Sequence, residues 1–263
     1  MVEFRSIAQA GVAMLALSAA AQVQAGGLSA SGWQASRDVI GQTSTATVVA
    51  GGNPLYIPNQ AQYRSTVGIT MDYGGGRVFV CSGTLVNAVS VVTAAHCVSD
   101  GTRARPLVTT VYFNTGNDDI AVYANQPGTA TRAVESIAVN PNYTGQVIDQ
   151  NDIAVLRLSS AAPSIVTAAK LSSLSDLTGL DHIVAGYGAR SSSGGTNGTL
   201  AGFGLGTGRL RYAGNRFEAR IGDADFGGRW AADLSDGADV DHVWMSDFDN
   251  GTAFRDQMCN VAT

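Results

Sequence analysis

Two residues that could carry out acid–base chemistry stand at the ends of apolar segments. His96 lies in the run V-V-T-A-A-H-C (residues 91–97), where two small alanines would let the backbone turn tightly. Asp152 stands 56 positions later (152 − 96), at the head of the alternating segment I-A-V-L-R-L (residues 153–158). A histidine becomes a general base when its ring is held beside a hydroxyl that it can deprotonate and a carboxylate that fixes its tautomer. An acid that leads an apolar strand is expected to be partly buried, so it needs a partner.

Each of these signals alone also fits an ordinary structural role. A lone histidine near an apolar strand is more often a satisfied structural residue, and an acid before a strand is usually a turn residue. Both occur here in chain order, together with Cys81 and Cys97. The segments C-S-G-T-L (residues 81–85), T-A-A-H-C (residues 93–97) and D-I-A-V-L-R-L (residues 152–158) resemble the histidine and aspartate segments of trypsin-like serine proteases.

Three further segments are similar to the same family. I-A-V-N-P-N-Y (residues 137–143) resembles its I-x-x-H-P-x-Y segment, with asparagine where histidine is usual. A-A-K-L (residues 168–171) resembles the stretch that crosses between the family's two barrels, and G-Y-G (residues 186–188) resembles its G-W-G strand end. The resemblance covers residues 67–190 well and fades after them.

The resemblance implies a fold, a reaction and a disulfide. The implied fold class is all-β, a trypsin-like pair of antiparallel barrels with the second barrel incomplete. His96 would act as general base and then general acid in peptide-bond hydrolysis, with Asp152 orienting its ring, so protein or peptide substrates are expected. The implied bridge between Cys81 and Cys97 would close a loop of 16 positions (97 − 81). Such a bridge stabilises the folded state by about 3 kcal/mol.

Short β-branched or alternating segments between glycine- and asparagine-rich turns also favour a barrel or sandwich. We expect the first barrel, with His96 and Asp152, at residues 48–165 and a partial second barrel at residues 166–263. The predicted strands are residues 77–86, 90–93, 108–115, 120–123, 153–158, 183–185 and 209–221, with one helical turn at residues 94–98.

The sequence offers no serine with the surroundings of a nucleophile. The family's serine lies in G-D-S-G-G-P, and this string does not occur here. Its glycines let two backbone N–H groups point at the developing oxyanion. Ser193 is preceded by a serine and comes too early, and Ser235 and Ser246 lack flanking glycines. We interpret all three as turn residues and assign no nucleophile.

Two explanations of the missing serine loop remain open. Residues 247–259 resemble the stretch that leads towards the serine loop in some bacterial relatives, and Cys259 has no obvious partner. We therefore expect a serine endopeptidase whose sequence stops before that loop, inactive as written. The alternative is a protease-like binding module without catalytic activity.

The start of the chain predicts export. In residues 1–25, Arg5 precedes an apolar stretch that ends in small residues, as in a signal peptide. Residues 26–47 are expected to be a propeptide or flexible lead. V-V-A-G-G (residues 48–52) loosely resembles the start of proteolytically activated family members, and equally a strand edge with a glycine turn. Secretion to the extracellular or periplasmic space would allow the disulfide.

Composition argues against other partners and cofactors. The net charge is −5 and no basic patch occurs, so we expect no nucleic-acid partner. No later run is long enough to cross a bilayer, so we expect no membrane association after signal removal, and a monomer. The aspartates of the last third do not fit an EF-hand, residues 202–208 do not fit a dinucleotide fingerprint, and His182 and His242 lack metal-ligand spacing. We therefore assign no metal and no cofactor.

Overall fold

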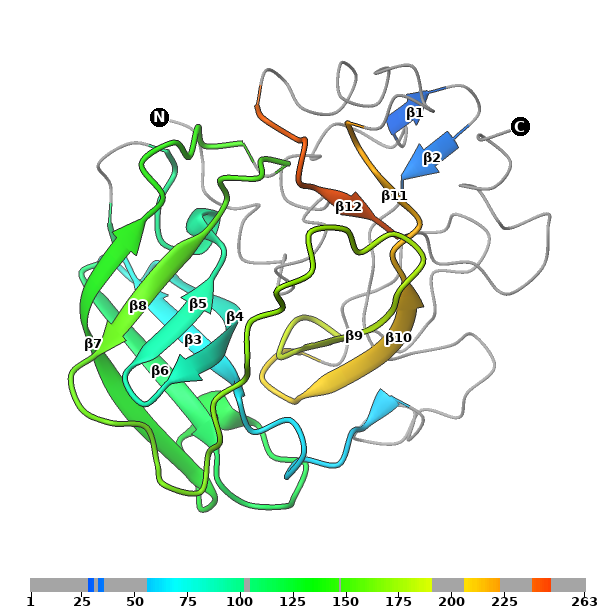
Figure 1. Cartoon of the computed structure of the whole chain (residues 1–263). Coiled ribbons are helices and arrows are strands. Elements are labelled where there is room, and N and C mark those ends of the chain that lie inside the picture. The colour runs from blue at the N-terminus through cyan, green and yellow to red at the C-terminus, as the bar shows by residue number, and fades with distance from the viewer. Residues whose placement is uncertain are drawn as a thin grey trace.

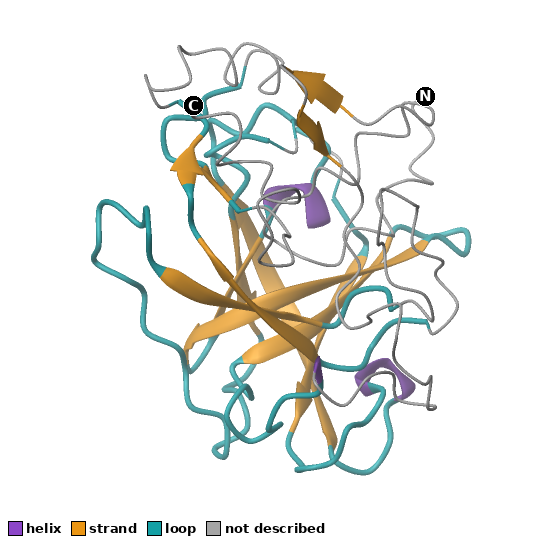
Figure 2. Cartoon of the chain, turned by 90° about the vertical axis from the view of Figure 1, so that its right-hand side faces the viewer, coloured by secondary structure: helices purple, strands orange, loops and turns teal. Residues whose placement is uncertain are grey.

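The computed structural model describes residues 28–30, 33–35, 56–101, 105–146, 148–190, 206–222 and 238–246. Strands and loops make up nearly all of these residues, and helices are confined to short 3-10 turns (Figure 2). The strands are β1 (Leu28–Ala30), β2 (Trp33–Ala35), β3 (Thr66–Asp72), β4 (Val78–Asn87), β5 (Ser90–Thr93), β6 (Val108–Asn114), β7 (Thr129–Val139), β8 (Ala154–Leu158), β9 (Asp181–Gly186), β10 (Arg211–Arg216), β11 (Ala219–Arg220) and β12 (Trp244–Met245). The 3-10 turns are η3 (Ala95–Cys97) and η4 (Val122–Ala124).

Six strands form a closed antiparallel barrel in the order β3-β4-β5-β8-β7-β6 (Figure 1). Side chains alternate between its inside and outside, because successive residues of a strand point to opposite faces. In β8, Ala154, Leu156 and Leu158 are buried, whereas Val155 and Arg157 are exposed. Closure leaves these six strands without a free edge. The barrel is therefore a self-contained scaffold for the loops at its ends.

The later part of the chain forms two pairs of strands, β9 with β10 and β11 with β12. The first pair packs on the barrel through Tyr187, whose backbone N–H donates to Ser82 Oγ at 2.8 Å. Tyr187 also forms a buried apolar cluster with Val122 and Leu210. The predicted all-β class with one complete and one incomplete barrel is thus confirmed for the part of the chain that the structure describes.

The strand predicted at residues 120–123 is wrong, because this segment contains the 3-10 turn η4 instead. The Tyr123 hydroxyl turns inward and donates to the Cys81 carbonyl at 2.9 Å. Gly68 leaves room for the ring, since a Cβ there would lie 2.7 Å from Tyr123 Cε1. Asn125 then ends the turn with a φ of 47°. A contact between distant residues has overridden a local β-branched signal.

Other strand boundaries differ less. The segment predicted as one strand at residues 209–221 is divided into β10 and β11, because the N–H groups of Phe217 and Glu218 donate to Leu180 and Met245 instead. Strands β3 and β7 were not among those predicted. The helical turn expected at residues 94–98 is present as η3.

No helix among the described residues combines the length and the apolar character that crossing a membrane requires.

Candidate active site

His96 and Asp152 are placed by two neighbouring barrel strands. β5 pairs with β8, and Thr93 at the end of β5 lies opposite Ala154 at the start of β8. His96 comes three positions after this pair (96 − 93) and Asp152 two positions before it (154 − 152). Antiparallel pairing sets the end of one strand beside the start of the other. The register of one ladder therefore brings together two residues that are far apart in sequence.

The Asp152 carboxylate contacts His96 with both of its oxygens. His96 Nδ1 lies 2.6 Å from Asp152 Oδ2, and the His96 backbone N–H donates to Asp152 Oδ1 at 2.8 Å. Only 4% of the His96 side chain and 11% of the Asp152 side chain are exposed. An ionised carboxylate only accepts hydrogen bonds, so a neutral imidazole beside it carries its proton on Nδ1 and its lone pair on Nε2. Nε2 is buried and has no partner among the described residues, so it is left to accept a proton.

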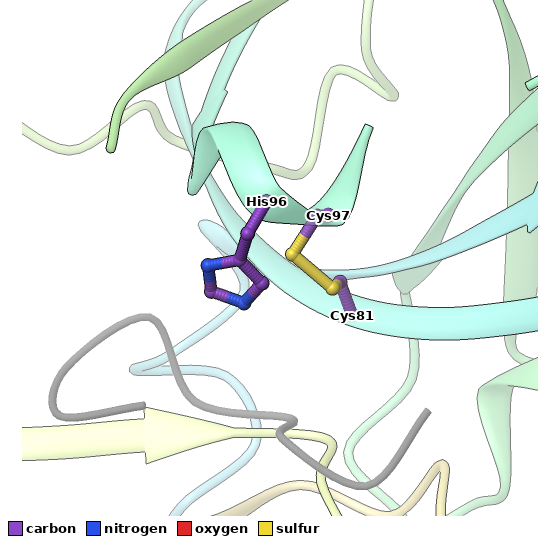
Figure 3. Close-up of side chains that lie close together, drawn as sticks. All are labelled: Cys81, His96 and Cys97. Carbon is purple, nitrogen blue, oxygen red and sulfur yellow. A yellow bond between two sulfur atoms is a disulfide. The ribbon is translucent and has the colours of Figure 1, made fainter. Parts of the chain in front are cut away.

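A disulfide fixes the turn that carries the histidine. Cys81 in β4 and Cys97 in η3 are joined, as the family resemblance implies (Figure 3). Donor atoms of Cys81, His96 and Cys97 lie within 4.8 Å of one another, which is close enough for metal ligands. The two sulfurs are bonded to each other, however, and the ligand form of cysteine is the thiolate. The cluster therefore holds the backbone of η3 and is not suited to a metal ion.

A buried carboxylate organises the loop before Asp152, which we call the acid loop (residues 148–152). Asp149 is 5% exposed. It accepts hydrogen bonds from the Thr144 N–H at 3.1 Å, the Thr144 hydroxyl at 2.7 Å and the Asn151 N–H at 2.8 Å. The Asp152 N–H donates to the Asp149 carbonyl at 2.9 Å. Buried polar groups that are paired in this way hold one backbone conformation.

Tyr143 lies beside the acid loop with its hydroxyl buried. The hydroxyl has no hydrogen-bond partner among the described residues. Burial raises the pKa of Tyr143 most, and the negative charges of Asp152, Asp149 and Asp100 raise it further. The phenol therefore stays neutral near these carboxylates at ordinary pH.

Two glycines allow the loop after His96 to pack on the loop before Asp152. Gly101 has a φ of +80° and Gly145 a φ of +94°. A Cβ on Gly101 would lie 2.6 Å from the Gly145 Cα atom, closer than real Cβ contacts come. Glycine alone tolerates both the left-handed backbone and this approach.

The remaining predicted residues do not join this pair. Ser193, Ser235 and Cys259, the expected signal peptide and residues 48–52 lie outside the described residues. Ser246 follows β12 and does not bond to His96 Nε2, which has no described partner. His182 stacks on Phe217 with a ring separation of 3.9 Å.

Comparison with known protein families matches this architecture. A family model described as Trypsin matches residues 49–204, more than half of the chain. The chain belongs to the trypsin family. Peptide hydrolases are thus its relatives, and the matched range includes both His96 and Asp152.

The chain is similar to several curated trypsin-family proteins. It is 30% identical to Trypsin, alkaline C of Manduca sexta over 151 residues, which are 56% of this chain and 54% of that protein. It is 30% identical to Trypsin of Sus scrofa over 116 residues, covering 43% and 45% of the two chains. It is 36% identical to Inactive CLIP domain-containing serine protease A3 of Aedes aegypti over 93 residues, covering 34% and 18%. The chain thus spans about half or less of the length of these relatives.

Sequence reasoning missed two residues that shape the acid loop, Asp149 and Gln150. The available signal was the polar run D-Q-N-D (residues 149–152) directly before an apolar strand. Such a run marks a loop with its own side-chain hydrogen bonds, but it does not identify their partners.

Proposed function

We propose that this chain is a secreted member of the trypsin family of serine endopeptidases, in which His96 has the place of the general base and Asp152 orients it. The observation that carries the proposal is the 2.6 Å contact between His96 Nδ1 and Asp152 Oδ2, with Nε2 unpartnered among the described residues. An imidazole held in this tautomer can take a proton from an attacking hydroxyl and then deliver it to the leaving amine. Proteins or peptides are the proposed substrates.

We further propose that the nucleophile is not among the 263 residues. No serine here has the G-D-S-G-G-P surroundings that place two N–H donors at the oxyanion. A serine loop encoded outside these residues would supply both the nucleophile and the donors. The 263 residues alone are therefore proposed to be inactive as a peptidase. Export is supported by the Cys81–Cys97 disulfide and by the signal-like pattern of residues 1–25.

A second candidate function is that of a protease-like binding module. It is favoured by the similarity to a relative whose name describes it as inactive. Under this alternative, His96 and Asp152 would persist as a structural pair and no serine loop would complete them.

A labelling experiment separates these functions. The purified chain of 263 residues is treated with a fluorophosphonate probe and assayed on casein, beside the same chain extended by the codons that follow Thr263 in its gene. We expect labelling and hydrolysis only in the extended chain, and loss of both in its His96→Ala variant. His182→Ala is the matched control, because His182 stacks on Phe217 away from the Asp152 contact.

Stoichiometric labelling of the unextended chain that disappears in His96→Ala would show that one of its own serines is the nucleophile. An extended chain that is folded but neither labels nor hydrolyses casein would favour the binding module.

A further inference from the structure

Gln150 joins the acid loop to a distant segment of the chain. Its backbone N–H donates to the Asp239 carbonyl at 2.8 Å, and its side-chain Nε2 donates to Asp239 Oδ2. Its Oε1 accepts the backbone N–H of His242 at 3.0 Å. Gln150 thus donates two hydrogen bonds and accepts one, and all three join the acid loop to residues 239–242, about ninety positions later in the chain.

Residues 239–242 are anchored in the second half of the chain and are not a loose loop. Val240 is 4% exposed, and Met245 in β12 is 3% exposed. The Val243 N–H donates to the Val240 carbonyl at 3.1 Å, and the Ile221 N–H donates to the Val243 carbonyl at 2.9 Å. Gln150 is therefore held by a segment that has a fixed place of its own.

Gln150 is also close in the chain to the carboxylate that orients His96. It is followed by Asn151, whose N–H donates to Asp149 Oδ1 at 2.8 Å, and then by Asp152. The Asp152 N–H donates to the Asp149 carbonyl at 2.9 Å, so residues 149–152 form one compact turn. A displacement of Gln150 is therefore expected to displace Asp152, which is only two peptide units away.

We propose that Gln150 is a positioning residue, which ties the acid loop to residues 239–242 and so makes the His96–Asp152 geometry depend on the second half of the chain. The inference rests on the proposed function for its catalytic meaning. An amide is the group that fits, because it must donate to a carboxylate and accept from a backbone N–H at the same time. Glutamate would keep the acceptor for His242 but would place a second carboxylate against Asp239.

The test exchanges donor and acceptor between the two side chains. Gln150→Glu removes the side-chain bond to Asp239 Oδ2 and sets two carboxylates against each other, while the backbone bond to the Asp239 carbonyl remains. Gln150→Glu with Asp239→Asn rebuilds the side-chain bond in the opposite sense, since an asparagine amide can donate to the new carboxylate. Gln126→Glu is the matched control, because Gln126 is also half-buried and its Nε2 donates at 3.2 Å to the Ala121 carbonyl within a single loop.

The readout is the hydrogen exchange of single backbone amides in the folded 263-residue chain, followed by NMR. The His96 amide reports directly on its bond to Asp152 Oδ1, and the amides of β3 report on the barrel as a whole. In Gln150→Glu we expect exchange of the His96 and Asp152 amides to accelerate about tenfold, the factor that loss of one hydrogen bond produces. The double variant should restore exchange to within about twofold of the unchanged chain.

Unchanged exchange at His96 in Gln150→Glu would overturn the proposal, as would failure of the double variant to restore it. Equal acceleration in β3, or the same effect at His96 in Gln126→Glu, would show general destabilisation and would also overturn it. Exchange does not require catalysis, so this outcome is independent of the labelling result that tests the proposed function.

Discussion

Replacing Asp152 by asparagine tests whether the carboxylate fixes the tautomer of His96. Asparagine keeps one oxygen, which can still accept the His96 backbone N–H, but it places an NH2 group against Nδ1. Two donors cannot share a hydrogen bond. The imidazole is therefore expected to release its proton from Nδ1 and to carry it on Nε2, where it can no longer accept one.

The cost follows from the bond at Nδ1, where a charged acceptor is exchanged for a neutral amide donor, while the bond from the His96 backbone N–H is kept. A hydrogen bond to a charged group contributes about 1.5–3 kcal/mol. Only 11% of the Asp152 side chain is exposed, so water compensates little for the loss of the charge beside Nδ1. For a chain of this size each kcal/mol lowers Tm by about 2–4 °C. A neutral bond contributes about 0.5–1.5 kcal/mol, so the exchange costs about 1–1.5 kcal/mol and Asp152→Asn should lower Tm by about 2–6 °C.

The assay combines thermal unfolding with 15N NMR of the imidazole, whose two nitrogens shift differently when protonated. Asp181→Asn is the control, because the Asp181–Arg216 ion pair leaves the two side chains 77% and 60% exposed. Such surface pairs contribute about 0–1 kcal/mol, so its Tm should barely move. A proton that stays on Nδ1 in Asp152→Asn, with Tm unchanged, would refute the tautomer argument.

Three further outcomes are expected. Gly101→Ala should lower the free energy of unfolding more than Gly75→Ala, because both have positive φ but only Gly101 meets another backbone; comparing the two urea midpoints checks this. Replacing Cys81 and Cys97 together by serine should cost about 3 kcal/mol of that free energy, measured by urea unfolding without reductant; a loss below 1 kcal/mol would contradict it. Burial lowers the pKa of His182 despite the opposing charge of its neighbour Asp181, so the unfolded chain binds more protons just below the ordinary pKa of 6.5. Stability should therefore decrease as the pH is lowered through that window, and His182→Gln should reduce the slope of Tm against pH there.

The contact between His96 and Asp152 was predictable because each residue stands in a short segment with a recognisable local pattern. His96 and Asp152 stand in short segments whose letters identify a family, and each lies within three residues of a strand that the apolar pattern also marks. The alternation that buries Leu156 and Leu158 predicted β8 for the same reason, since it is a property of neighbouring residues.

The parts that could not be predicted depend on contacts between distant residues. Residues 120–123 have strand-like composition, yet the bond from Tyr123 to Cys81 spans 42 positions and makes a 3-10 turn of them. Gln150 and Asp239 are 89 positions apart, and the sequence around each residue does not indicate that the two will be in contact. Such hydrogen bonds form only when the folded barrel brings the two polar side chains together.

Because Thr93 pairs with Ala154, the segment of chain between these two residues can vary in length. Between these two residues the chain forms β6 and β7, and it then enters β8, which pairs with β5. Residues gained or lost at the exposed positions 127–128 would change the length of the connection between β6 and β7 without changing the pairing of Thr93 with Ala154. A one-residue slip of β8 against β5, in contrast, would turn the whole inner row of β8 outward. We therefore expect changes in chain length to be tolerated in the connection between β6 and β7, and shifts in the pairing of β5 with β8 to be destabilising.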